Sequence, residues 1–189
     1  MADASSPSAE EGTADGAMGE FTGDSPSKAV GDLAGVFRDG VIGAVAGFAG
    51  VVLLSMVLVV AAALGAFDSE AFAELADLVG LGAFPQRTLI GYVIFVGGGM
   101  TTFPLLFASV QEYLPGPTMA LRGIGFATIV WTGFLPAFHT GQSGVALALY
   151  IVLSLVAHWA YGFALGSAFE FFAERVGGFL GGKGTVAGR

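Results

Sequence analysis

Cysteine is absent from the 189 residues, and charged side chains make up only 12% of them. Without cysteine, the chain has no disulfide bonds and no cysteine-ligated metal centre. A soluble domain carries roughly 25% charged residues, so this chain has too little charge to cover a water-soluble globule. Lys and Arg together number only 7 against 15 Asp and Glu, and the resulting net charge of −8 excludes a basic nucleic-acid-binding surface.

Apolar residues dominate instead, at 54% of the chain. They gather in four stretches, each long enough for a helix that crosses roughly 30 Å of hydrocarbon. No alternation with a period of two runs through them, which argues against a β-barrel. We therefore predict an all-α fold, a four-helix membrane bundle in the plasma membrane, with spans at about 41–66, 88–110, 119–138 and 144–169.

The two ends of the chain differ in composition from this bundle. Residues 1–40 contain eight acids against Lys28 and Arg38, and such a segment buries too little apolar area to offset its ordering entropy. We predict a disordered acidic cytoplasmic tail over residues 1–37, although the last turns before residue 41 are compatible with the start of the first helix. The transmembrane domain then covers 38–176, and 177–189 form a flexible Gly-rich tail.

Positive charge predicts the orientation, because cytoplasmic loops near helix ends retain Lys and Arg. With the amino terminus inside, only Arg87 falls on the outer side. The inner side holds the other six basic residues, Lys28, Arg38, Arg122, Arg175, Lys183 and Arg189. Both termini are therefore expected in the cytoplasm.

The outer connection at 67–87 has the pattern of a short amphipathic helix at the membrane interface. Asp68 or Ser69 can cap its start, and Gly80 with Gly82 can end it. Its acidic face comprises Glu70, Glu74 and Asp77, and its apolar face Phe72, Leu75 and Val79. It is either a surface helix that anchors the loop or a docking surface for an external partner.

Acidic side chains are missing between the predicted span boundaries, and the only Arg there, Arg122, is close enough to the inner interface to snorkel. Ion-coupled carriers place ionisable groups at depth, so this absence argues against a proton-coupled antiporter. No phosphate-binding loop, nucleophile elbow or zinc-protease motif is present either, and we expect no enzymatic activity.

His158 is the titratable residue expected at depth, and its imidazole must find a polar partner. It lies on a stripe with Ser154, Gly162 and Gly166, whose small residues are typical of a helix–helix contact. The hydroxyls at matching depth belong to Ser55, Thr101, Thr102, Thr128 and Thr132. His158 is either a neutral side chain hydrogen-bonded between packed helices or a contact for a ligand, quinone or haem.

Haem ligation would need a second axial ligand, although the sequence requires no cofactor. His139 lies at the outer end of the third span, some 20 Å from His158 by helical rise, which argues against bis-His ligation within one chain. Met100 or Met56 matches the depth of His158 better, but methionine in an apolar core is usually packing.

Glycine and tryptophan supply the packing and interface candidates. Gly43 and Gly47 permit close helix approach, and Gly97–Gly99 followed by Pro104 predict a bend in the second span, because proline crowds the carbonyl of Met100. Trp131 and Trp159 fall near mid-membrane, where each indole N–H needs an acceptor inside the bundle or on a partner subunit.

Three segments carry a family resemblance: FPLLFASVQEYLPGP, RGIGFATIVWTGF and LSLVAHWAYGFALGSAF. In this order they resemble, over about residues 38–172, small four-helix membrane proteins of halophilic archaea with no established activity. Some relatives resemble products encoded among terminal cytochrome oxidase genes, which implies an accessory role in respiration. The positions that match the pattern are Arg122, Trp131, His158, Trp159, Tyr161 and Gly162.

We therefore expect a non-catalytic accessory or assembly subunit of a membrane complex of the respiratory oxidase type. Two alternatives remain open, a small carrier or channel with a site near His158 and a haem- or quinone-binding membrane protein. The expected partners are the lipid bilayer and either other membrane subunits or further copies of the chain.

Overall fold

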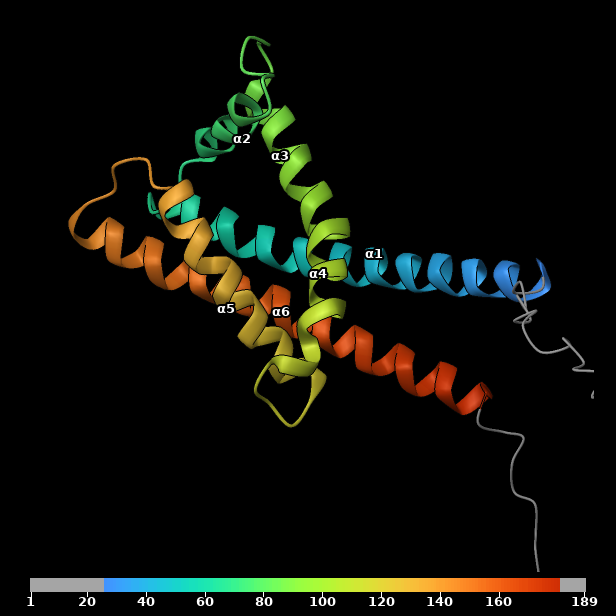
Figure 1. Cartoon of the computed structure of the whole chain (residues 1–189). Helices are drawn as coiled ribbons and strands as arrows, with labels where there is room; N and C mark the ends of the chain where they lie inside the picture. Colours follow the sequence, from blue (N-terminus) through green and yellow to red (C-terminus); the bar gives the residue numbers. More distant parts are fainter. Residues whose placement is uncertain (1–25, 181–189) are drawn as a thin grey trace, which may run out of the picture. The chain divides into compact units, whose positions relative to one another are not determined.

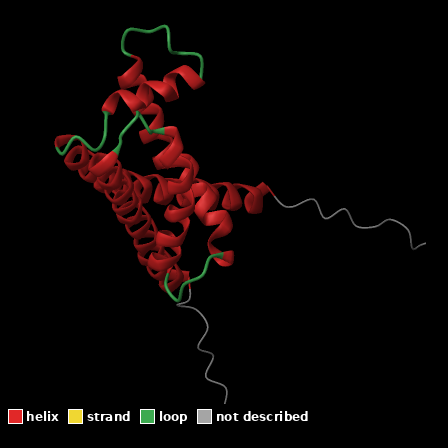
Figure 2. Cartoon of the chain, turned by 90° about the vertical axis from the view of Figure 1, so that its left-hand side faces the viewer, coloured by secondary structure: helices red, strands yellow, loops and turns green. Residues whose placement is uncertain are grey.

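The fold is known from a computed structural model, which describes the backbone of residues 26–180 and the side chains of residues 40–172, 174 and 175. This part of the chain contains helices joined by loops and no strand (Figure 2). Its α-helices, labelled in Figure 1, are α1 (Pro26–Ala63), α2 (Ala73–Leu78), α3 (Arg87–Gly97), α4 (Phe103–Val110), α5 (Met119–Ala137) and α6 (Gly144–Leu180).

Four helical stretches are long and apolar enough to cross a membrane, as predicted. They comprise Gly40–Ala63, Arg87–Tyr113, Met119–Ala137 and Gly144–Phe172. Their ends lie within three residues of the predicted spans. The second stretch is composite, because α3 and α4 are joined by a π-helical segment, Gly98–Thr102, and followed by a 3₁₀ turn, Gln111–Tyr113.

The first and last helices, α1 and α6, extend beyond the boundaries predicted for the helical domain. Residues 26–37 were assigned to a disordered tail, yet they are helical, and α6 continues through residues 177–180. Proline is favoured at the first turn of a helix, and the Ala, Leu and Lys that follow Pro26 are good helix formers. Residues 1–25 and 181–189 lie outside the described part. All packing reported below lies within the unit that begins at Val36.

Helices α5 and α6 form an antiparallel pair side by side (Figure 1). A Cβ atom on Gly162 would lie 2.6 Å from Cβ of Ala127 and would clash with the carbonyl oxygen of Gly123. Gly166 meets the backbone of Met119 in the same way. The two helices therefore approach backbone to backbone, which only glycine at these positions permits.

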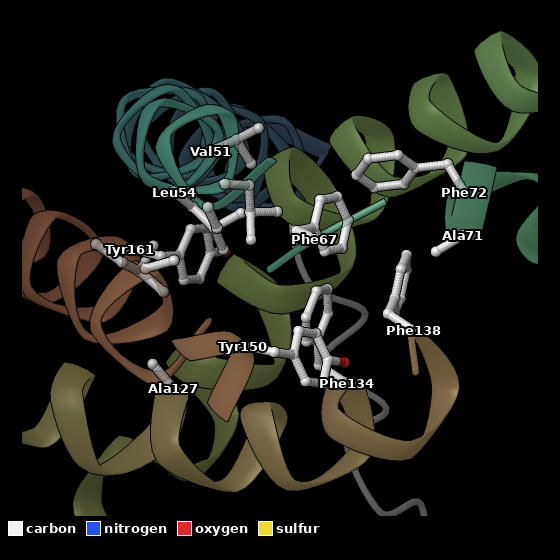
Figure 3. Packing of buried hydrophobic residues seen from close by; sticks show 14 of the residues in the cluster. Val51, Leu54, Phe67, Ala71, Phe72, Ala127, Phe134, Phe138, Tyr150 and Tyr161 are labelled. Carbon is white, nitrogen blue, oxygen red and sulfur yellow. The ribbon is translucent and has the colours of Figure 1, made fainter. Parts of the chain in front are cut away.

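Aromatic rings pack together at the end of the bundle where α1 and α5 terminate. Phe134 and Phe138 of α5 stack with their ring centres 4.2 Å apart. Phe72 meets Phe138 edge-on at 5.4 Å, and Phe67, just beyond α1, lies against Phe72 at 5.6 Å (Figure 3). This cluster, Phe67, Phe72, Phe134 and Phe138, ties the end of α1 and the outer connection to α5.

The outer connection is helical, but its buried face differs from the predicted one. It begins as a 3₁₀ turn, Ser69–Phe72, which the Asp68 side chain caps by accepting from the backbone N–H of Glu70 at 2.9 Å. Phe72, Ala73 and Ala76 are buried, whereas Val79 is 53% exposed. A 3₁₀ turn advances three residues per turn rather than 3.6, so it rotates the faces expected of a continuous α-helix.

Candidate functional site

The π-helical segment Gly98–Thr102 leaves one backbone carbonyl of the second span free for a side chain. The N–H of Phe103 bonds to Gly98 O, five residues back, and Pro104 has no N–H to donate. Gly99 O therefore lacks its usual helical donors. It accepts the Tyr161 hydroxyl of α6 at 2.7 Å instead. Where a bend was predicted, the helix changes its winding, which relieves the crowding by Pro104.

Helix α1 packs directly onto this segment. A Cβ atom on Gly47 would lie 2.7 Å from Cγ of Pro104 and 2.9 Å from Cα of Met100, and it would clash with Gly99 O. Gly43, one helical turn earlier, faces Pro104 at 3.3 Å. Glycines at positions 43 and 47 thus allow α1 to pack closely against the π-helical segment.

A cavity of about 530 Å³, here called the lateral pocket, lies next to this contact, and its walls come mainly from the second span and α5. Ile129, Thr132, Gly133 and Ala137 on its α5 side are exposed on the outside of the bundle. The pocket is thus accessible from the side of the bundle. Its lining is Val51, Leu54, Leu75, Ile94, Phe95, Gly98, Gly99, Phe103, Ile129, Val130, Thr132, Gly133, Phe134, Ala137, Phe138, His158 and Tyr161. Figure 3 shows Val51 and Leu54 of α1 near Tyr161.

His158 lines the lateral pocket and is 2% exposed. Its Nδ1 lies 2.8 Å from the carbonyl oxygen of Ser154 in its own helix, and its ring packs on Phe134 with centres 4.7 Å apart. A carbonyl oxygen can only accept, so Nδ1 carries a proton and donates it. In the neutral imidazole Nε2 is then an acceptor.

Of the five hydroxyls suggested as partners of His158, four bond to other groups. Thr101, Thr128 and Thr132 donate to carbonyls of their own helices, at Gly97, Ile124 and Ile129, and Ser55 bonds Tyr92. Thr102 makes no side-chain hydrogen bond to a described residue. His158 Nδ1 bonds instead to the carbonyl four residues back in its own helix, which lies within reach of the ring, so the partner is a backbone group and not one of these hydroxyls.

The two tryptophans bond across the α5–α6 pair rather than outward. Trp131 Nε1 donates to Ser154 Oγ at 3.0 Å, and Trp159 Nε1 donates to Thr128 Oγ1 at 3.0 Å. Each helix thus donates one indole hydrogen bond to the other and accepts one from it.

Arg122 lies at the start of α5, where its Nε donates to Gly116 O at 3.1 Å and fixes the preceding turn. Arg122 and the two tryptophans therefore all donate hydrogen bonds to groups of the same chain.

The side chains considered as a second haem ligand do not line the lateral pocket with His158. Met100 contributes backbone to the contact with α1, Met56 is 61% exposed, and His139 is exposed and bonds to Gln142 O at 3.2 Å. Across the described residues, no three His, Asp or Glu side chains come together as metal ligands. His158 is therefore the single candidate ligand that lines the pocket.

Fold and site together define a class, a helical protein with four stretches able to span a membrane and an apolar pocket open to the side. The chain belongs to DUF6789, a family of unknown function, whose family model matches residues 37–177. No curated protein and no solved structure matches it. The matched residues include all four helical stretches and the whole lateral pocket.

Proposed function

We propose that this chain is a non-catalytic multi-pass protein of the plasma membrane that binds a small lipophilic molecule in the lateral pocket. The observation that carries the proposal is the pocket itself, about 530 Å³ with an almost wholly apolar lining and one histidine. Ligand sites are clefts of about 300–1,000 Å³ with mostly apolar walls and a few polar groups. This one falls within that range.

The position of the pocket supports entry from the bilayer. Its exposed side lies between two helical stretches that are long and apolar enough to face lipid. A molecule dissolved in the hydrocarbon would reach it without crossing water. Gly98 and Gly133 line this pocket, and a Cβ atom at either position would have no neighbouring atom within 4 Å. Neither glycine is therefore covered by another part of the chain.

A pocket-filling substitution tests the proposal. Gly133→Phe places a ring in the lateral pocket without a backbone clash, and Gly125→Phe, on the same helix and equally unobstructed, lies outside the lining and serves as the control. Protein purified in mild detergent is extracted with organic solvent and analysed by mass spectrometry. We expect a lipophilic compound in near-stoichiometric amount with the parent and Gly125→Phe, and its loss with Gly133→Phe. Equal recovery from both variants would refute binding in this pocket.

We also propose that both termini are cytoplasmic, on the strength of the six basic residues on that side and one, Arg87, on the other. Because the chain has no native cysteine, a single Glu74→Cys substitution reports the side of the outer connection. A membrane-impermeant thiol reagent should label it on intact cells. Labelling only after lysis would reverse the assigned orientation.

A role as an accessory or assembly subunit of a respiratory oxidase-type complex is the second candidate. It is favoured by how little of the spans is covered within the chain: in the most apolar window of the second span, only 17% is buried. The family resemblance also points this way. Native electrophoresis of mildly solubilised membranes tests it: co-migration with larger haem-containing complexes supports it, and migration as a lone small oligomer opposes it.

A further inference from the structure

Each polar side chain that lines the lateral pocket already donates a hydrogen bond to a carbonyl oxygen of the chain. The Tyr161 hydroxyl donates to Gly99 O at 2.7 Å, the Thr132 hydroxyl to Ile129 O at 2.7 Å, and His158 Nδ1 to Ser154 O at 2.8 Å. All three partners are carbonyl oxygens, which have no proton to give in return. Among the side chains of the lining, no hydrogen-bond donor remains for a ligand.

Acceptors, by contrast, remain available. His158 is nearly fully buried in an apolar wall, where a charged imidazolium would be costly, so the neutral ring presents the lone pair of Nε2. Nε2 makes no hydrogen bond to any described residue. Pro136, four residues on within α5, has no N–H, so the carbonyl of Thr132, another lining residue, also lacks its usual α-helical donor.

We propose, resting on the proposed function, that the lateral pocket selects apolar molecules that donate a hydrogen bond, with His158 Nε2 as the acceptor. The ligand class is a phenol or hydroquinone on an apolar body. The oxidised quinone of the same shape is disfavoured, since its carbonyl would oppose a lone pair and leave two buried acceptors without a proton between them.

A set of compounds built on one ring tests this preference. Tetramethylhydroquinone, its dimethyl ether and tetramethylbenzoquinone differ in their donors while sharing one methylated ring. Their dissociation constants are measured by anaerobic titration calorimetry on the full chain in lipid nanodiscs, with empty nanodiscs as the blank. We expect the hydroquinone to bind about 3- to 10-fold more tightly than the ether or the quinone, the range of one net hydrogen bond.

His158→Phe separates the acceptor from the shape of the wall. It keeps a planar ring against Phe134 and removes Nε2, so the hydroquinone should lose its advantage while the affinity for the ether stays the same. Gly125→Phe should leave the parent pattern unchanged. If His158→Phe does not fold, as judged by circular dichroism and gel filtration, the comparison of the three compounds on the parent still decides the question.

The outcomes distinguish the two proposals. Equal affinities for all three compounds on the parent, abolished by Gly133→Phe, would overturn the donor preference and leave the pocket as a binding site. A preference for the quinone would overturn the acceptor assignment of His158. A hydroquinone preference that Gly133→Phe does not weaken would place binding elsewhere on the chain and overturn both proposals. No binding of any compound to the parent would overturn the donor preference, and the extraction experiment above would then decide alone whether the pocket binds.

Discussion

Replacing Gly162 by alanine is the most direct test of the backbone contact between α5 and α6. The added methyl group would lie 2.6 Å from Cβ of Ala127 and would clash with the Gly123 carbonyl, which belongs to the backbone and cannot rotate away. The helices must then separate by roughly an ångström. Such overpacking costs about 1–3 kcal/mol.

Two further terms set the expected magnitude. Separation stretches the two indole bonds, Trp131 to Ser154 and Trp159 to Thr128, both 3.0 Å long, and interhelical hydrogen bonds in membranes contribute about 0.6 kcal/mol each. Against this, alanine gains about 1 kcal/mol of helix propensity over glycine. We expect Gly162→Ala to be destabilised by about 1–3 kcal/mol.

Gly125→Ala is the matched control, because its Cβ has nothing within 4 Å and only the propensity gain applies. It should be about 1 kcal/mol more stable than the parent. Unfolding by sodium dodecyl sulfate in mixed micelles, followed by circular dichroism and tryptophan fluorescence, measures both variants. If Gly162→Ala proved as stable as Gly125→Ala, the close approach of α5 and α6 would be refuted.

Three other substitutions probe separate contacts. Tyr161→Phe leaves the buried Gly99 carbonyl without its donor and should cost about 1–3 kcal/mol in the same unfolding assay; an unchanged midpoint would show that the carbonyl has another partner. Asp68→Ala removes the cap of the outer 3₁₀ turn and should cost about 1 kcal/mol, measured as faster amide exchange in that turn. Asp77→Asn breaks an exposed ion pair with Arg87 at 3.5 Å and should change stability by less than about 1 kcal/mol, with a larger loss pointing to a buried role.

The spans were predictable because bilayer thickness fixes their length, and composition alone reveals a stretch of that length. Which face of a span meets another helix was harder to predict, since lipid and protein neighbours are equally apolar and leave no periodic contrast. The remaining sequence evidence for a helix–helix contact is the position of small residues. Gly43, Gly47, Gly162 and Gly166 were singled out on this basis, and all four lie in close contacts.

The candidate site was predictable only in part. His158 was identified from its chemistry and depth, but the lateral pocket around it depends on how the second span and α5 diverge, which no local pattern records. The hydrogen bond to Ser154 O was missed because a local backbone acceptor competes with distant hydroxyls without any distinctive sequence signal. The Gly-rich run before Pro104 did signal an irregular helix, although not its π winding.

The π-helical segment Gly98–Thr102 also fixes the rotation of α3 relative to α4. Each residue of an α-helix advances the chain by about 100°, so deleting one residue here would restore regular winding and turn α3 by that angle. Ile94 and Phe95 would then leave the wall of the lateral pocket, although neither was changed. The shape of the pocket therefore depends on the number of residues in this segment as much as on their identity. Insertions and deletions in this segment should reshape the pocket even where every lining residue is kept.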